Sequence, residues 1–352
     1  MGNPIMNKMN KPLKISGAFY FLLLLSFIAC QQSPKTSSSS LPIVLKGETM
    51  GTTYSIIYYD VQKRHLQSSI DSFLIAFDRS ISTYNPKSVI SAFNKNKSLA
   101  TNDRYLKTLF HESTKIHQQT DGFFDPTVMP LVNHWGFGNQ QKKEVSAASV
   151  DSLLALIGFE RIGLVQQTPQ QYTLKKQNPL SQLDFNAIAK GYGVDLVGEL
   201  LEGRKVTNYL VEIGGEMRAS GQKPNGDFWK VAIDRPIDTL KTRLQEAGLL
   251  LKNQSLASSG NYRNFYVKDG QKIVHTINPK TGYPEISRLL SASIVASSCM
   301  YADAYATACM VMGLEKAKVF VQEHPEIQAL LIYAEEDGVL QTWETEGLER
   351  LF

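Results

Sequence analysis

The stretch Asp184-Phe185-Asn186-Ala187-Ile188-Ala189-Lys190-Gly191 takes the chain from an apolar run into a helix within a few residues. Residues 182–185 read as strand-like, and apolar side chains then recur at helical spacing from Ile188 to Leu201. Gly203 is a typical helix stop. The sequence therefore predicts the end of a short strand followed by a helix over 188–201.

A helix that starts near a lysine can bind an anion. Unpaired N–H groups from Ala187 to Lys190, the positive end of the helix dipole and the Lys190 ammonium would all favour a phosphate here. The pattern Gly191-Tyr192-Gly193 is weak evidence for nucleotide binding and is not a Walker loop. Taken alone, the stretch favours an ordinary capped helix with a solvated lysine, and phosphate binding is the minority interpretation.

The N-terminal residues have the composition of a secretion signal. Residues 1–30 contain three lysines, no acidic residue and an apolar run over 18–29 that is too short for an ordinary membrane span. Ala29 directly before Cys30, with two glutamines after it, resembles a bacterial lipoprotein signal, in which the cysteine is lipidated and becomes the mature N-terminus. The alternative is a plain cleaved signal with an incidental cysteine.

Three parts follow from this division of the chain. Residues 1–30 are predicted to be the signal peptide, the serine-rich residues 31–41 a flexible tether, and residues 42–352 one large domain or two closely packed subdomains. Loss of the three lysines of the signal would lower the formal net charge from +4 to about +1. The mature chain thus has no basic excess that would indicate nucleic-acid binding.

The mature part retains two cysteines, Cys299 and Cys309, in one apolar segment. Ten residues of helix would separate them by roughly 15 Å, too far for a disulfide. We therefore expect buried, unreactive thiols. The six histidines are scattered without the spacing of a zinc site.

Strand-like runs and helical patterns succeed each other without regular alternation. The predicted strands cover 43–59, 209–213, 228–233, 265–267, 289–296 and 329–333. The predicted helices cover 69–79, 103–119, 147–157, 188–201, 301–312 and 315–323. Clusters of consecutive strands separated by helices favour an α+β fold with largely antiparallel sheets over a doubly wound sheet.

Asp303 and Thr307 are four residues apart in an alanine-rich helical segment and so share one face. Both are hard oxygen donors of the type that suits Mg²⁺, which takes one or two carboxylates and substrate phosphate oxygens. An aspartate near a helix start and a threonine bonded to a backbone carbonyl are equally common. The pair by itself leaves a metal site and a structural role equally open.

Two loops carry further candidates. Residues 122–127 and 130–138, rich in glycine, proline and aromatics, could wrap a planar ring, although a packed surface loop is commoner. His275 stands at the edge of a strand beside the turn 278–282, where a base could face a cleft, but a lone histidine is more often structural. The glycine pair before Glu216 suits either close approach of a ligand or a turn.

In this order, the motifs resemble those of the ApbE family of FAD:protein FMN transferases, over about residues 50–313. The segments that carry the resemblance are Met50-Gly51-Thr52-Thr53-Tyr54, Ser82-Thr83-Tyr84-Asn85-Pro86, 122–127, 184–191, Gly214-Gly215-Glu216, Ser259-Gly260-Asn261-Tyr262, 275–284 and 302–307. The implied fold is a duplicated, T-fold-like α+β unit with FAD held between the halves.

The resemblance also implies the site residues. It places FAD against Met50, Tyr84, Phe123, Phe124, Asp125, Asp184, Lys190 and Ile277. It assigns Mg²⁺ to Asp303, Thr307 and the backbone carbonyl of Ala187. His275 is our candidate general base, and Asp303 is expected to be essential as a metal ligand.

The implied reaction is Mg²⁺-dependent transfer of the FMN half of FAD to a threonine or serine hydroxyl of an acceptor flavoprotein, which forms a phosphoester and releases AMP. Two alternatives stay open: an FAD pyrophosphatase that yields FMN and AMP, and a flavin-binding lipoprotein without chemistry. A lipid anchor at Cys30 would hold the protein on the periplasmic side of the inner membrane. The expected acceptors are periplasm-facing subunits of redox complexes.

Overall fold

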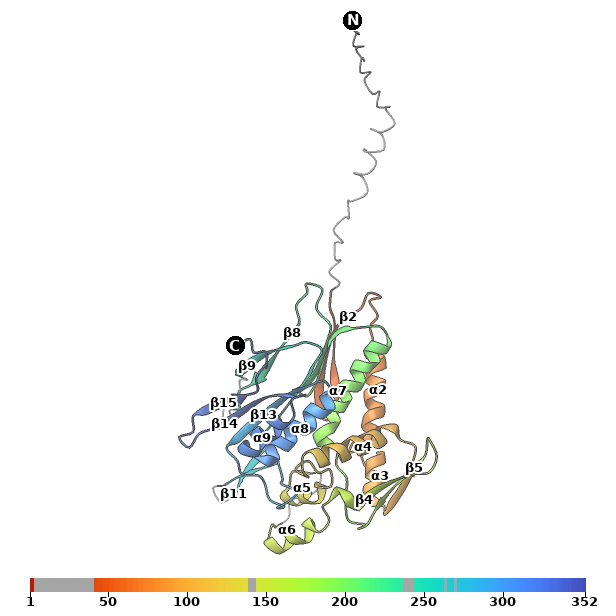
Figure 1. Cartoon of the computed structure of the whole chain (residues 1–352). Coiled ribbons are helices and arrows are strands. Elements are labelled where there is room, and N and C mark those ends of the chain that lie inside the picture. The colour runs from red at the N-terminus through yellow and green to blue at the C-terminus, as the bar shows by residue number, and fades with distance from the viewer. Residues whose placement is uncertain (3–40, 139–143, 237–243, 263–264, 269–270) are drawn as a thin grey trace. The chain divides into compact units, whose positions relative to one another are not determined.

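An eight-stranded antiparallel sheet forms the centre of the fold in this computed structural model (Figure 1). The structure describes residues 1–2, 41–138, 144–236, 244–262, 265–268 and 271–352. The strands lie in the order β1 (Ile43–Thr49), β2 (Thr52–Tyr59), β6 (Asn208–Ile213), β7 (Glu216–Ser220), β10 (Ser255–Gly260), β13 (Leu289–Ala296), β14 (Gln328–Ala334) and β15 (Leu340–Glu344).

Two similar halves make up this sheet. The first half runs β1, β2, then helices α2 (Gln67–Ile81) and α7 (Asn186–Gly203), then β6 and β7. The second half repeats the pattern with β10, β13, helices α8 (Cys299–Met312) and α9 (Leu314–Glu323), then β14 and β15. Every neighbouring strand pair is antiparallel. The predicted duplicated α+β fold is therefore confirmed.

Three additional segments lie within or between the two halves. The largest, between α2 and α7, contains a three-stranded sheet and short helices: α3 (Val89–Lys95), β3 (Ser98–Thr101), α4 (Arg104–Gln119), α5 (Met129–Trp135), α6 (Ala147–Leu154), η1 (Phe159–Arg161), β4 (Ile162–Gln166) and β5 (Tyr172–Lys176). The other two are hairpins, β8 (Trp229–Asp234) with β9 (Gln245–Leu251), and β11 (Phe265–Lys268) with β12 (Gln271–Val274).

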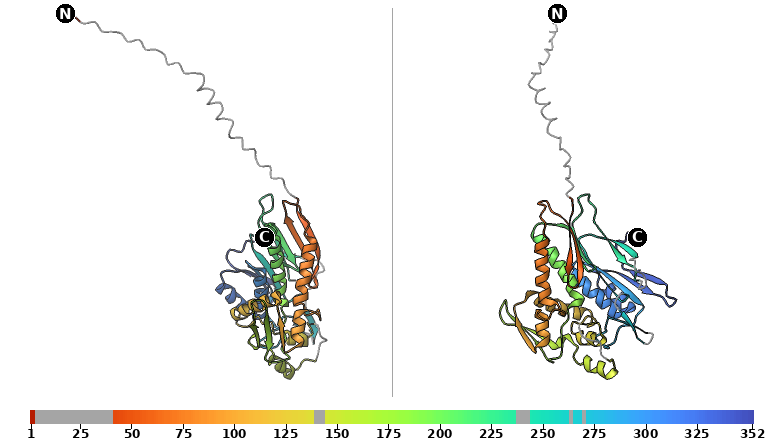
Figure 2. Two further views of the ribbon diagram at one scale, coloured as in Figure 1. Left: turned by 90° about the vertical axis from the view of Figure 1, so that its right-hand side faces the viewer. Right: turned by 180° about the vertical axis from the view of Figure 1, so that it is seen from behind.

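Alternating apolar side chains explain why the sheet is covered on both faces. In β13, Ile294 packs in the same core as α8, whereas its neighbour Val295 packs with Trp229 of β8 on the other face. In the first half, Ile56 of β2 and Val211 of β6 pack in one core with residues of α2 and α7. Figures 1 and 2 show α2 beside the first strands from several directions. Each fully buried side chain of this size contributes about 1.5–3 kcal/mol.

Helices α7 and α8 pack against each other unusually closely. Alanines at 302, 304, 306 and 308 leave little side-chain bulk on α8. A Cβ atom added at Gly191 of α7 would lie 2.3 Å from the carbonyl oxygen of Cys299. The glycine therefore permits a helix–helix distance that a larger residue would prevent.

Two predictions about the backbone were wrong. The run 43–59 is a hairpin rather than one strand, because Met50 and Gly51 turn the chain with φ values of 47° and 71°. Residues 182–185 form no strand. The N–H of Leu183 instead donates to Asn94 Oδ1 at 2.8 Å, and that of Asp184 donates to the Pro126 carbonyl at 2.8 Å. Tertiary hydrogen bonds thus replace a β-ladder in this segment.

The six predicted helices are present, with small shifts at their ends. The helix predicted over 147–157 ends at Leu154, and the helix predicted over 188–201 extends from Asn186 to Gly203. Residues 3–40, which include Cys30, nearly all of the signal peptide and nearly all of the tether, lie outside the described residues. Within the ranges that the structure describes, no helix is long and apolar enough to span a membrane.

Candidate functional site

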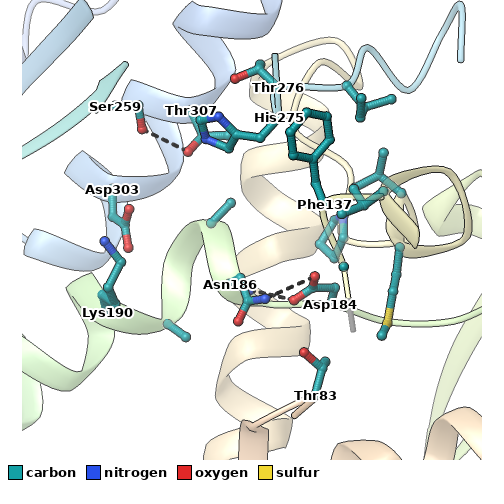
Figure 3. A pocket seen from close by; sticks show the side chains of 18 of the residues that line it. Thr83, Phe137, Asp184, Asn186, Lys190, Ser259, His275, Thr276, Asp303 and Thr307 are labelled. Carbon is teal, nitrogen blue, oxygen red and sulfur yellow. Dashed lines mark hydrogen bonds between the residues drawn. The ribbon is translucent and has the colours of Figure 1, made fainter. Parts of the chain in front are cut away.

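A cavity of about 820 Å³ lies at the junction of the two halves. Its wall includes Met50 and Glu216 from the first half, Ser259 and Asp303 from the second, and the 123–138 loop region from the large insertion. Every candidate FAD, metal and catalytic residue that the structure describes lines this cavity, including all those that the resemblance implied. The tertiary structure thus brings the separate sequence motifs into one site (Figure 3).

Helices α7 and α8 form one wall of the cavity. The N–H of Gly191 donates to Asp303 Oδ2 at 2.9 Å, so Asp303 is held against the first turns of α7. Thr307 lies one helical turn beyond Asp303, and its hydroxyl shares a 3.1 Å hydrogen bond with the hydroxyl of Ser259 (Figure 3). Ala187 lies one turn before Gly191 and also lines the cavity. One carboxylate, one hydroxyl and one backbone segment therefore face the same space.

Lys190 is an ion-pair partner as well as a cavity residue. Its Nζ atom lies 2.5 Å from Oε1 of Glu216, which is only 3 % exposed. Burial lowers the pKa of Lys190, but the charges of Glu216 and Asp303 outweigh this effect and raise it. The lysine therefore carries its positive charge inside the site. Its direct contact with a phosphate remains a prediction.

The buried acids outnumber the buried cation. Burial raises the pKa of Glu216 to about 8 and raises the pKa of Asp303, although Lys190 opposes both shifts. Oε2 of Glu216 is buried and has no hydrogen-bond partner among the described residues. Two carboxyls share one ammonium here, so Glu216 keeps its proton at neutral pH, and a bound cation would favour ionisation of both carboxyls.

The donor set fits a hard divalent cation. Asp303 and Thr307 provide a carboxylate and a hydroxyl, and Ala187 can add a carbonyl oxygen, which are the donor types that Mg²⁺ prefers. Among the described ranges the structure contains no cluster of three or more His, Cys, Asp or Glu residues with metal-binding spacing. The candidate metal site is accordingly one built from a single carboxylate and neutral oxygens.

The prediction of free N–H groups at the start of α7 was wrong in part. The N–H groups of Ile188 and Ala189 both donate to the carbonyl of Phe185, at 3.0 and 2.8 Å. The N–H of Asn186 donates to Oδ1 of Asp184, also at 2.8 Å. Local capping thus occupies donors that could otherwise have bound a phosphate.

The loop that follows α4 supplies apolar and acidic groups to the cavity. Phe124 is buried, whereas Phe123 is half-buried with the ammonium groups of Lys280 and Lys316 at 4.2 and 4.9 Å from its ring centre. Asp125 accepts hydrogen bonds from the N–H and the hydroxyl of Thr127, at 2.7 and 2.6 Å. Burial nevertheless raises the pKa of the Asp125 carboxyl.

Met50, Tyr84 and Asp184 line the cavity near the first half. Tyr84 is 63 % exposed, so its ring is accessible to a ligand without any rearrangement of the core. Asp184 is half-buried, and burial raises its pKa to about 6 even though Asn186 donates two hydrogen bonds to it. This carboxyl therefore changes charge close to physiological pH.

His275 enters the cavity from the second half. It follows strand β12 directly, and its ring makes an edge contact with Phe137 at 6.3 Å between ring centres. Thr276 next to it donates to Oδ1 of Asn261 at 2.5 Å, and Ile277 is buried. The histidine is half-buried and lies on the same cavity as Asp303 and Thr307 (Figure 3), as a base that serves that site would have to.

Sequence reasoning did not identify several residues of this site. Glu216 and Ser259 were noticed within motifs, but their pairing with Lys190 and Thr307 was not predicted. Asn186 and Asp78 line the cavity without having been singled out. Glu216 and Ser259 lie 26 and 48 residues from their partners along the chain, so no local spacing could have revealed these two pairs.

The duplicated α+β fold and the oxygen-donor site between its halves define a known class of protein. The sequence matches the model of the ApbE family over residues 50–331, and the chain belongs to this family. It is an enzyme of the transferase class. The predicted family resemblance is therefore confirmed.

Known proteins of this family are similar to the chain in both sequence and structure. The chain is 36 % identical over 337 residues to the FAD:protein FMN transferase of Haemophilus influenzae, with 92 % of this chain and 94 % of the relative covered. It is 34 % identical to the FAD:protein FMN transferase of Escherichia coli K12, with 91 % and 92 % covered. The flavin transferase ApbE of Vibrio cholerae superposes with a TM-score of 0.76 at 33 % identity, covering 87 % of this chain and 98 % of the other.

Proposed function

We propose that this protein transfers the FMN moiety of FAD to a threonine or serine hydroxyl of an acceptor protein, in a Mg²⁺-dependent reaction that leaves a phosphoester and releases AMP. The observation that carries the proposal is the single cavity in which Asp303 and Thr307, Lys190 and His275 meet from both halves of the fold. The relatives named FAD:protein FMN transferase support the same substrate and product.

Different residues of the cavity would have different roles in the reaction. The acceptor hydroxyl oxygen bonds to the phosphorus of the FMN half, and the bond from that phosphorus to the bridging oxygen breaks, so AMP leaves with that oxygen. His275 takes the proton of the attacking hydroxyl, a role worth typically 10² to 10⁴-fold in rate. Lys190, held by Glu216, places a positive charge beside the pyrophosphate.

Asp303, Thr307 and the Ala187 carbonyl would hold the metal ion. A bound Mg²⁺ supplies neutralisation of charge on the pyrophosphate, which is most of what phosphoryl transfer requires of an enzyme. Asp303 is oriented for this by the Gly191 N–H, and Thr307 by the hydroxyl of Ser259. These hydrogen bonds fix the donor atoms before the metal arrives.

We also propose where in the cell the reaction takes place. A lipid anchor on Cys30 and the serine-rich tether would hold residues 42–352 on the periplasmic side of the inner membrane. The acceptors would then be flavoprotein subunits of redox complexes that face the periplasm. The intact mass of the mature N-terminus measures lipidation directly, and an unmodified Cys30 would contradict the anchor.

One experiment separates the proposed transferase from the two alternatives. Residues 42–352 are incubated with FAD, Mg²⁺ and a periplasm-facing flavoprotein subunit, and the intact mass of the acceptor and the small-molecule products are measured. FMN mass on the acceptor supports transfer, free FMN and AMP without acceptor labelling support a pyrophosphatase, and intact FAD supports a carrier. An acceptor in which the target hydroxyl is replaced by alanine is the control.

A further inference from the structure

Two facing rows of residues, each spaced at one helical turn, connect the candidate metal site to a buried carboxylate outside it. On α7 the row is Ala187, Gly191 and Asp195, and on α8 it is Cys299, Asp303 and Thr307. The helices run antiparallel along these rows, because Asp195 meets Cys299 and Gly191 meets Asp303. The candidate metal ligands thus lie at one end of a helix contact whose other end is Asp195.

Asp195 holds the N-terminus of α8 with both of its oxygens. Oδ1 accepts from the N–H of Cys299 at 3.1 Å, while Oδ2 accepts from the N–H of Met300 at 2.9 Å and from the hydroxyl of Ser298 at 2.7 Å. Ser298 is the N-cap of α8, but its own side chain makes no capping bond. The cap of α8 is therefore supplied by a residue of α7.

A third element completes the cluster. Arg218 of β7 donates to Oδ1 of Asp195 at 3.1 Å and to Glu202 of α7 at 3.1 Å. Asp195 is only 5 % exposed, and a buried charge needs partners. This guanidinium and the N–H groups of α8 supply them. Asp195 is absent from the wall of the cavity. It therefore acts on the site through α8 rather than by touching a ligand.

The close contact between α7 and α8 makes the candidate metal site sensitive to small shifts of α8. Along α8 each residue advances the helix by about 1.5 Å, so a slip of one residue would carry Asp303 and Thr307 away from Ala187 and rotate their side chains. The narrow approach at Gly191 sets the distance between the helices. The three bonds to Asp195, together with the bond from the Gly191 N–H to Asp303, fix the position of α8 along the axis of α7.

We propose that Asp195 is a positioning residue: by capping α8 from α7, it keeps Asp303 and Thr307 opposite Ala187 so that the three can bind one metal ion. This inference rests on the proposed Mg²⁺-dependent function. It assigns to a buried ion cluster, Asp195 with Arg218, a role in metal affinity that is separate from its role in stability.

The test compares Mg²⁺ binding with stability in matched variants of residues 42–352. Asp195→Asn retains the size of the side chain but replaces one acceptor oxygen by a donor, and Ser298→Ala removes only one bond of the cap. Glu202→Gln is the control, because it weakens the other partner of Arg218 on α7 without touching α8. MgCl2 is titrated by calorimetry in the presence of FAD, and melting temperatures are measured without metal.

We expect Asp195→Asn to weaken Mg²⁺ binding by about tenfold, the lower end of the range for residues that orient metal ligands, and Ser298→Ala to weaken it less. FAD binding without metal should stay at the parental value. Glu202→Gln should bind Mg²⁺ like the parent even if its melting temperature falls. If Asp195→Asn folds and binds Mg²⁺ with parental affinity, the positioning role is refuted.

Two further outcomes are distinguishable. If the Asp195 and Glu202 variants lose metal affinity equally and in proportion to their loss of melting temperature, the effect is general destabilisation and the inference is overturned. If the parent protein binds no Mg²⁺ at all, the proposed metal-dependent function fails first, and the metal-positioning role of Asp195 falls with it.

Discussion

The substitution Gly191→Ala tests whether the close contact of α7 and α8 creates the site. An added Cβ would lie 2.3 Å from the Cys299 carbonyl oxygen and 2.8 Å from Cβ of Asp303, and the first of these atoms belongs to the backbone. Ordinary contact begins at 3.4 Å, so the helices must separate by 3.4 − 2.3 = 1.1 Å at this point. The shift would move Asp303 relative to Ala187.

The expected loss of activity is larger than the expected loss of stability. Overpacking costs about 1–3 kcal/mol, and the better helix propensity of alanine returns up to about 1 kcal/mol, so the free energy of unfolding should fall by about 0–3 kcal/mol. A misplacement of about 1 Å at a catalytic site can cost roughly 100-fold in rate. The variant should therefore fold but transfer FMN about 100-fold more slowly.

The assay measures the initial rate of FMN transfer at saturating FAD and Mg²⁺ together with the melting temperature. Gly203→Ala is the matched control, since it is the same substitution at the end of the same helix and its Cβ would meet no atom within 4 Å. The control should keep the parental rate and an equal or slightly higher melting temperature. A Gly191→Ala protein with the parental rate would refute the reasoning.

Four further predictions concern single groups of the site and core. Asp303→Asn should keep the bond from the Gly191 N–H, and so the fold, while transfer falls at least about 100-fold and Mg²⁺ binding is lost, because the carboxylate charge is gone; parental activity in excess chelator would contradict this. His275→Ala should slow transfer by about 10² to 10⁴-fold and remove a pH dependence of the rate; an unchanged pH–rate profile would exclude His275 as the base. Burial raises the pKa of Asp184 from 3.8 to about 6, so the folded state binds this proton more tightly than the unfolded chain, and the stability contribution of Asp184 declines as pH rises through that range. The melting temperature of the parent relative to Asp184→Asn should therefore fall from pH 4 to pH 7, and a constant difference would contradict the shift. Burial raises the pKa of Cys309 to about 12 and that of Cys299 well above its ordinary value, so neither thiol of the folded domain should react with iodoacetamide; labelling without denaturant would contradict their burial.

Much of the fold could be predicted from local pattern. The periodic segments gave helices whose ends moved by only a few residues, and β13 begins and ends at Leu289 and Ala296 as predicted. The strands and α-helices that were not predicted are β3, β4, β5, β7, β9, β10, β12, β15, α3 and α5. Most of these strands have only four or five residues and the two helices have seven, which is too short for a clear periodic signal. The single run 43–59 was misread, since the positive φ of Met50 has no reliable sequence signal in a non-glycine residue.

The sequence identified the candidate site only as separate motifs. Each motif alone had an ordinary structural interpretation, and the family resemblance was needed to combine Asp184, His275 and Asp303. Their places on one cavity follow from the duplicated fold, which brings residues of both halves to the junction. Two of the N–H groups expected to be free at the start of α7, those of Ile188 and Ala189, donate to the carbonyl of Phe185, because short-range bonds form without tertiary help.

The sequence by itself determined the six longest helices, about half of the strands and the burial of the cysteines, because these depend on residue type and on spacing within one element. The tertiary structure alone decided that Lys190 pairs with Glu216 and that Asp195 caps a helix beginning 104 residues later. Such contacts depend on the relative placement of α7, β7 and α8, which close packing fixes and no local pattern encodes.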